Sequence, residues 1–130
     1  MKNEPIKMHQ DQDDLQLFFI NRDVDRWNDE VASIKEEIIL FTKMLTANSN
    51  KDYSNILEKL NDFRTENTRF AEELISYTNK LEILKECEDL QCETFFLNTH
   101  NDFQDKIELH FSDYRNFKKN IFLVINTKND

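Results

Sequence analysis

The sequence contains no glycine and a single proline, Pro5. Glycine provides the positive-φ residues of tight hairpins and the close backbone approach of phosphate-binding loops. Without glycine, the P-loop, the dinucleotide-binding fingerprint and the glycine-flanked turn that presents a catalytic serine are all absent. Because proline is also missing beyond residue 5, no proline interrupts a helix in the rest of the chain. The two absences together favour an all-α protein.

Long apolar runs and concentrated basic charge are missing as well. The longest apolar run, residues 121–125, is far too short to span a bilayer, and the first twelve residues lack the apolar core of a signal peptide. The net charge is −9, with Lys118 and Lys119 as the only adjacent basic pair. Nucleic-acid backbones are bound by clustered lysine and arginine. Two cysteines do not make a disulfide framework. We therefore expect a cytoplasmic protein without nucleic-acid or membrane partners.

The residues that are present are typical of one globular domain. Of the 130 residues, 38% are hydrophobic and 33% charged, and the aromatic residues include eleven Phe, three Tyr and one Trp. A disordered acidic chain is poor in such residues. We expect a flexible polar arm at residues 1–12, a single helical domain at residues 13–126 and a short tail at residues 127–130.

Apolar residues recur at steps of three and four in three stretches, which is the spacing of one face of a helix. Asp13 or Asp14 could cap the first helix. The stripe positions are Leu17, Ile20, Val24, Trp27, Val31, Ile34, Ile38, Phe41 and Leu45; then Tyr53, Ile56, Leu60, Phe63, Asn67, Phe70, Leu74, Tyr77, Leu81 and Leu84; then Phe96, His100, Phe103, Ile107, His110, Tyr114, Phe117, Ile121 and Val124. They predict helices over about residues 13–47, 52–87 and 90–126.

The two breaks between the stripes differ in clarity. Residues 47–52 are rich in Asn, Ser and Asp, which compete with helix through local hydrogen bonds. The second break has no obvious breaker, and we place it at residues 87–91 because the three helices then match in length. The alternative is a turn at residues 98–102, with Thr99 and Asp102 as a capping box. That alternative leaves one long helix beside a much shorter one.

Short connections make consecutive helices antiparallel neighbours, so we predict an elongated, up-down-up three-helix bundle. The layout resembles a spectrin-type three-helix repeat, including a Trp in the first helix, here Trp27. This resemblance concerns architecture alone and implies no functional residues. We expect Trp27 to be a core aromatic residue.

Several polar residues occupy core positions of the stripes, and we expect them to form a structural polar core. Counting layers from the first turn places Asn67 and His110 opposite Val31. It also places Tyr77 and His100 in one further layer. We predict a hydrogen bond between Asn67 and His110, beside Trp27, because a buried amide or imidazole without a partner costs about 1–3 kcal/mol. Such a layer can fix the helix register, and the alternative is a ligand site.

The sequence offers little metal or catalytic chemistry. No His has a Glu three positions earlier, as a di-iron bundle requires. Cys87, Cys92 and His100 are the only soft-ligand constellation, and their spacing is a poor match to a zinc site. We expect ordinary thiols at the end of the bundle, with a metal site as the alternative and the pairing of the two cysteines left open. We expect no catalytic residue and no cofactor.

The function that fits these features best is a non-enzymatic interaction or adaptor module, with a protein partner or self-association. Ile75, Ile83 and Phe111 lie outside the stripes and are candidates for a partner face. One alternative is a bundle that binds a small ligand or metal through the polar core layer or the Cys87, Cys92 and His100 region. Another is an acidic inhibitor or immunity-type protein that masks a basic partner.

Overall fold

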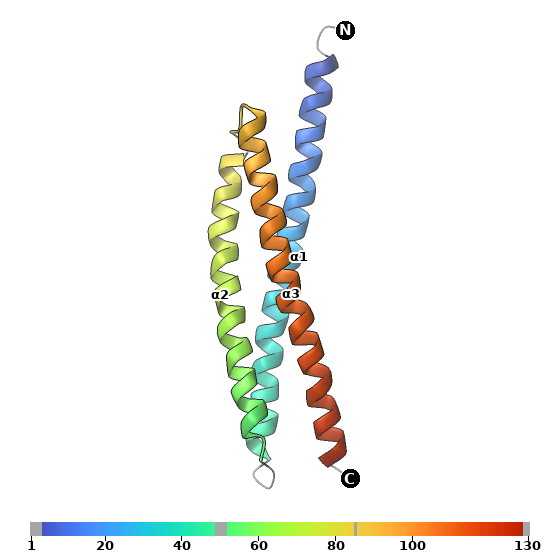
Figure 1. Ribbon diagram of the computed structural model, residues 1–130, viewed down its shortest axis with the longest axis vertical. Helices are drawn as coiled ribbons and strands as arrows, with labels where there is room; N and C mark the ends of the chain where they lie inside the picture. The colour runs from blue at the N-terminus through green and yellow to red at the C-terminus, as the bar shows by residue number, and fades with distance from the viewer. Residues whose placement is uncertain (1–3, 49–51, 85, 129–130) are drawn as a thin grey trace.

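A computed structural model describes residues 4–48, 52–84 and 86–128, with side chains from residue 14 to residue 126. Over these residues the chain forms three α-helices and no strand, namely α1 (Glu4–Ala47), α2 (Ser54–Leu84) and α3 (Leu90–Lys128). Consecutive helices run in opposite directions along one long axis, and α3 crosses the other two obliquely (Figure 1). The predicted up-down-up three-helix bundle is confirmed.

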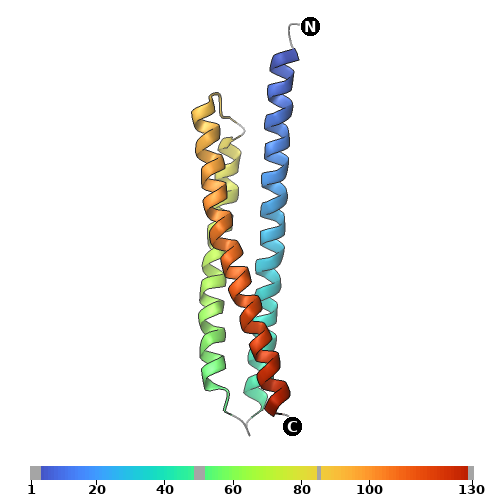
Figure 2. The same cartoon turned by 45° about the vertical axis from the view of Figure 1, so that its right-hand side comes forward.

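The first helix begins nine residues before the predicted start at residue 13, so most of the expected polar arm is helical. Residues 1–3 lie outside the described residues. Glu, Lys, Met and Gln are good helix formers, and Pro5 lies in the first turn, where its missing N–H has no helical partner to lose. Helix propensity therefore extends α1 on the N-terminal side of its first core residue. This end of α1 projects past the other two helices in both views (Figures 1 and 2).

The second turn lies where it was predicted rather than at residues 98–102, which are inside α3. Helix α2 ends at Leu84, three residues before the predicted end, and α3 begins at Leu90. Asp89 caps α3, because its Oδ1 accepts a hydrogen bond of 2.8 Å from the backbone N–H of Cys92. At the other end α3 continues to Lys128, so residues 127 and 128 of the predicted tail are helical.

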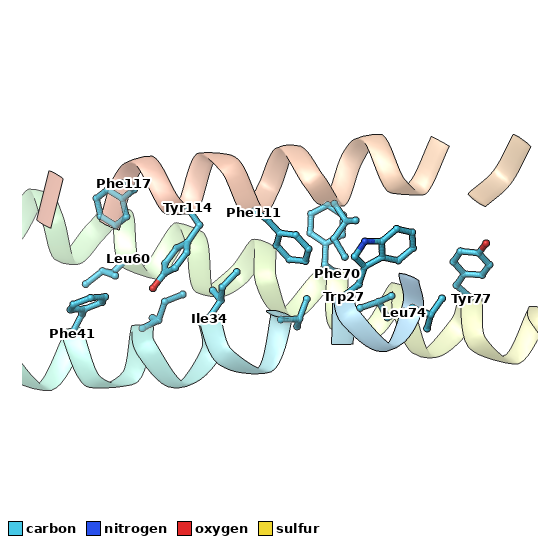
Figure 3. Close-up of a cluster of buried hydrophobic side chains, with 14 of the residues drawn as sticks. Trp27, Ile34, Phe41, Leu60, Phe70, Leu74, Tyr77, Phe111, Tyr114 and Phe117 are labelled. Atoms are coloured by element: carbon cyan, nitrogen blue, oxygen red, sulfur yellow. The ribbon is translucent and has the colours of Figure 1, made fainter. Parts of the chain in front are cut away.

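The core is a column of mostly apolar side chains along the three helices (Figure 3). Trp27, Leu74 and Ile107 have no exposed area. Phe63 of α2 contacts Tyr114 and Phe117 of α3, with ring centroids 5.7 and 5.1 Å apart. The Phe63–Tyr114 contact joins α2 to α3 four residues toward the first turn from Asn67. None of the described helices combines the length and the apolar run that a membrane span requires.

Candidate functional site

Two polar layers interrupt the apolar core, and the first is centred on Asn67. Its Oδ1 lies 2.9 Å from Nε2 of His110, and its Nδ2 donates to the backbone carbonyl of Val31 at 2.9 Å. Because an amide oxygen only accepts, Nε2 of His110 is the donor in this pair. The predicted Asn67–His110 hydrogen bond is confirmed, and the layer joins all three helices.

The second polar layer is a chain of hydrogen bonds from Tyr77 through His100 to Asp23. The Tyr77 hydroxyl lies 2.5 Å from Nδ1 of His100, and Nε2 of His100 lies 2.9 Å from Oδ2 of Asp23. A carboxylate only accepts, so Nε2 carries a proton and, in the neutral ring, Nδ1 accepts from Tyr77. Both histidine nitrogens are therefore occupied. The predicted pairing of Tyr77 with His100 in one layer is confirmed.

Trp27 is a core aromatic residue, as predicted, but it belongs to the second polar layer rather than to the first. Its ring stacks on His100 with centroids 5.0 Å apart and contacts Phe103 at 5.5 Å. Its Nε1–H donates to Glu108 at 3.1 Å, and the same carboxylate pairs with Arg26 at 2.6 Å. The buried indole thus has the polar partner that a tryptophan N–H requires.

A third polar cluster joins α1 to α3 toward the C-terminal end of α3. The Tyr114 hydroxyl donates to Glu37 at 2.9 Å, and the Lys118 ammonium lies 3.2 Å from both oxygens of the same carboxylate. In the part of the chain that the structure describes, no buried side-chain nitrogen or oxygen lacks a hydrogen-bond partner. The polar clusters therefore position the helices without leaving a buried side-chain polar atom unpaired.

Burial sets the protonation of the polar core. It lowers the pKa of His110 below its ordinary value of 6.5, which favours the neutral ring. It also raises the pKa of Tyr77, with a smaller contribution from the negative charge of Asp23. The pKa of Tyr114 is raised by burial first and then by its hydrogen bond to Glu37. Both hydroxyls therefore stay protonated and are poor bases or nucleophiles at neutral pH.

The prediction of ordinary thiols at the end of the bundle is wrong, because Cys87 and Cys92 form a disulfide. The turn between α2 and α3 brings their Cα atoms within 5.6 Å, which a continuous helix could not do. As a disulfide, neither sulfur is a thiolate ligand. His100 lies inside the bundle with both nitrogens bonded. The structure therefore does not assemble the candidate metal site, and the described residues hold no other group of three potential ligands.

Large apolar side chains are exposed mainly at the two ends of the bundle. The end that contains the disulfide exposes Leu15, Phe18, Phe19, Ile83, Leu90 and Phe95, and the opposite end exposes Ile39, Leu40, Met44, Phe122 and Leu123. Between them only Ile75 and Leu109 are exposed among the large apolar residues described. Phe111, expected as a partner-face candidate, is instead 1% exposed, because it lies on the side of α3 that packs into the core.

The charges are also divided between the two ends. Residues 11–20 and 82–97, which we call the acidic end, contain eight acidic residues and one lysine, a net of −7 out of the chain's −9. Residues 115–128 of α3, which we call the basic end, contain four basic residues and no acidic one. The helix directions place these segments at opposite ends of the long axis (Figure 1). The molecule is therefore strongly dipolar along its length.

A cleft of about 150 Å³ lies at the acidic end, where the three helices meet. Its walls include Leu17, Leu84 and Leu97, with Asp14 and Glu93 among the polar lining residues and Cys87 beside them. An apolar floor with carboxylates fits the aliphatic stem and charged head of a lysine or arginine side chain. A wider, more open groove of about 490 Å³ runs between α2 and α3 past His110.

No known protein family, curated protein or solved structure matches this chain.

Three acidic residues with structural roles were missed by the sequence interpretation, namely Asp23, Glu37 and Glu108. Each is half-buried at the edge of the core. The heptad pattern separates polar from apolar positions, but it does not show which polar residues contact a neighbouring helix. The spacing carries a signal, since Asp23 and Glu37 are 14 residues apart and so face the same neighbouring helix. Knowing that this neighbour is α3 requires the handedness of the bundle, which the sequence alone does not provide.

Proposed function

We propose that this protein is a non-enzymatic interaction or adaptor module that binds another protein through the apolar ends of a rigid bundle. The observation that carries the proposal is the grouping of exposed Phe, Leu, Ile and Met side chains at the two ends. A soluble protein gains nothing in stability from such groups, and contiguous exposed apolar patches are typical of binding surfaces. The satisfied polar layers inside keep the helices in one register, so the two ends are presented at a fixed separation.

Affinity capture from the source cell at gentle salt, read by mass spectrometry, tests this function. Two variants sharpen the test. Phe18→Ser combined with Phe95→Ser removes exposed aromatic rings from the acidic end. Ile75→Ser is the matched control, since Ile75 is similarly exposed but lies nine residues before the end of α2, outside the acidic end. We expect a stoichiometric protein to be retained by the native chain and by the control, and lost with the double variant. Equal retention by all three, or no retained protein, contradicts the proposal.

The acidic end favours one second candidate, an inhibitor or immunity-type protein that masks a basic partner. The cleft beside Asp14 and Glu93 could hold a basic side chain of that partner. Its signature is a captured protein that is basic, released by moderate salt, and lost with Asp14→Asn combined with Glu93→Gln. A partner retained in high salt and by that variant excludes this candidate and leaves the adaptor function.

A ligand- or metal-binding bundle has less support than either. Asn67 uses its polar atoms on His110 and Val31, and His100 uses both ring nitrogens on Tyr77 and Asp23. The Cys87–Cys92 disulfide bears on location as well, since disulfides are typical of oxidising compartments and rare in the cytoplasm. The disulfide therefore counts against the cytoplasmic location expected from the sequence, and alkylation of thiols in intact cells tests that location. Two alkylated cysteines support a cytoplasmic protein, and two protected ones exclude it.

A further inference from the structure

Outside its core positions, α1 carries a second, interrupted apolar stripe whose side chains are about half exposed. It consists of Leu15 and Phe19, one turn apart, and Leu40 and Met44, also one turn apart; these four side chains are between 48% and 56% exposed. Phe19 and Leu40 are three heptads apart, so in a bundle whose core repeats every seven residues they face the same way. Arg26 and Ser33 occupy the heptad positions between them.

The four residues are arranged symmetrically about the middle of the stripe. Leu15 and Met44 are equally far from the bond between Asp29 and Glu30, and so are Phe19 and Leu40. If two α1 helices lie side by side in opposite directions, Phe19 of each copy therefore meets Leu40 of the other, and Leu15 of each copy lies at the same level along the axis as Met44 of the other. A surface that matches itself under a two-fold rotation is the requirement for a closed dimer.

The charge distribution selects the antiparallel orientation over the parallel one. In the antiparallel arrangement the acidic end of each copy lies beside the basic end of the other, so both unlike pairs meet at once. In the parallel arrangement the two acidic ends would meet, which juxtaposes net charges of −7 on each copy. Phe122 of α3 packs on Phe41, the residue after Leu40, with ring centroids 5.7 Å apart. It is half exposed, so it adds to the apolar surface at the basic end.

We propose that the chain forms an antiparallel, two-fold symmetric homodimer through the second apolar stripe of α1, with the acidic end of each copy against the basic end of the other. The inference rests on the proposed interaction function and names a second copy of this chain as one partner. From Leu15 to Met44 the contact runs for about 44 Å at 1.5 Å per residue, which is long enough for an interface of ordinary size.

The first test is sedimentation of the purified, disulfide-bonded protein over a range of concentrations. We expect a monomer–dimer equilibrium without larger species. Zero-length coupling of carboxylates to amines, applied to a mixture of unlabelled and ¹⁵N-labelled protein, should then join Lys118 or Lys119 of one copy to the acidic end of the other. A monomer at high concentration, growth into long polymers, or crosslinks that join the two copies at like ends each overturn the dimer.

The second test is a charge pair that reads the register. Phe19→Glu alone and Leu40→Lys alone each put a charge against an apolar side chain, and we expect each to weaken the dimer about tenfold or more. Combined in one chain, the two charges face each other across the interface, so the double variant should dimerise more tightly than either single variant. The matched control is Phe19→Glu with Ile39→Lys, because Ile39 is adjacent to Leu40 but lines the groove between α1 and α2. Equal behaviour of the two double variants contradicts the register.

These tests fail independently of the proposed function. Sedimentation uses purified protein alone, and none of the dimer variants alters Phe18 or Phe95. A strictly monomeric chain that still captures a cellular protein through Phe18 and Phe95 overturns the dimer and leaves the interaction module intact. A chain that dimerises but captures no cellular protein overturns the interaction module and leaves the dimer intact.

Discussion

Asn67 and His110 are 43 positions apart in the sequence, and in the middle of the core Oδ1 of Asn67 accepts a hydrogen bond of 2.9 Å from Nε2 of His110. The Asn67 amide also donates to the carbonyl of Val31, so one side chain connects three helices. A slip of any helix along its axis would separate these atoms and leave a buried polar group without a partner. The pair therefore makes the native register energetically distinct from slipped alternatives.

Asn67→Leu should destabilise the bundle by about 1–3 kcal/mol, because it leaves the Nε2 proton of His110 buried without an acceptor. The double variant Asn67→Leu with His110→Leu should recover much of this loss, since both polar partners are then gone. The free energy of unfolding in urea measures both. The exposed Asn79→Leu is the control and should change it by less than about 0.5 kcal/mol. Additive losses in the double variant would show that the two residues are not coupled.

This layer was predictable because layers can be counted from a single well-marked turn. Asn67 and His110 fall at core positions of otherwise apolar stripes, and one register satisfies both. The start of α1 could not be found in the same way, because Glu4 to Asp13 precede the first stripe residue and only propensity decides their state. The disulfide depends on the conformation of the turn at residues 86–89, which the heptad pattern does not describe. The positions of Asp23, Glu37 and Glu108 depend on the side of α1 on which α3 lies.

Neutral His110 makes the stability of the bundle depend on pH in a defined direction. Burial lowers its pKa in the folded state below the ordinary 6.5, so below pH 6.5 the unfolded chain binds a proton that the folded chain does not. The contribution of His110 to the free energy of unfolding is therefore fully present above pH 6.5 and is lost as pH falls toward the folded-state pKa. Urea unfolding between pH 7.5 and pH 5 should show this loss.

His110→Gln is the matched variant for that measurement, because its amide nitrogen can replace Nε2 as the donor to Asn67 without titrating. We expect the variant to be less pH-dependent than the native protein over the same range. An unchanged pH dependence in the variant would assign the effect to another group.

The Tyr77–His100–Asp23 chain should respond unequally to loss of its two ends. Tyr77→Phe leaves the buried Nδ1 of His100 without its donor, and we expect a loss of about 1–3 kcal/mol. Asp23→Ala should cost less than about 1 kcal/mol, because the Asp23 side chain is 32% exposed and water can replace it. Chemical denaturation of the two variants checks the order. A larger loss for Asp23→Ala would mean that the charge of Asp23, rather than the buried hydroxyl, holds this layer together.

The Cys87–Cys92 disulfide should stabilise the bundle, with its largest local effect at the acidic end. It closes a loop with a sequence separation of 5, and chain-entropy reasoning gives about 2 kcal/mol for so short a loop. Reduction, or Cys87→Ser combined with Cys92→Ser, should therefore lower the free energy of unfolding by about this amount. Because Asp89 still caps α3, the loss should appear in hydrogen exchange as faster opening of residues 81–97, with the Asn67 layer still protected. Uniformly faster exchange along all three helices would instead show that the whole bundle unfolds as one unit from this end, and that the disulfide stabilises the core rather than the turn.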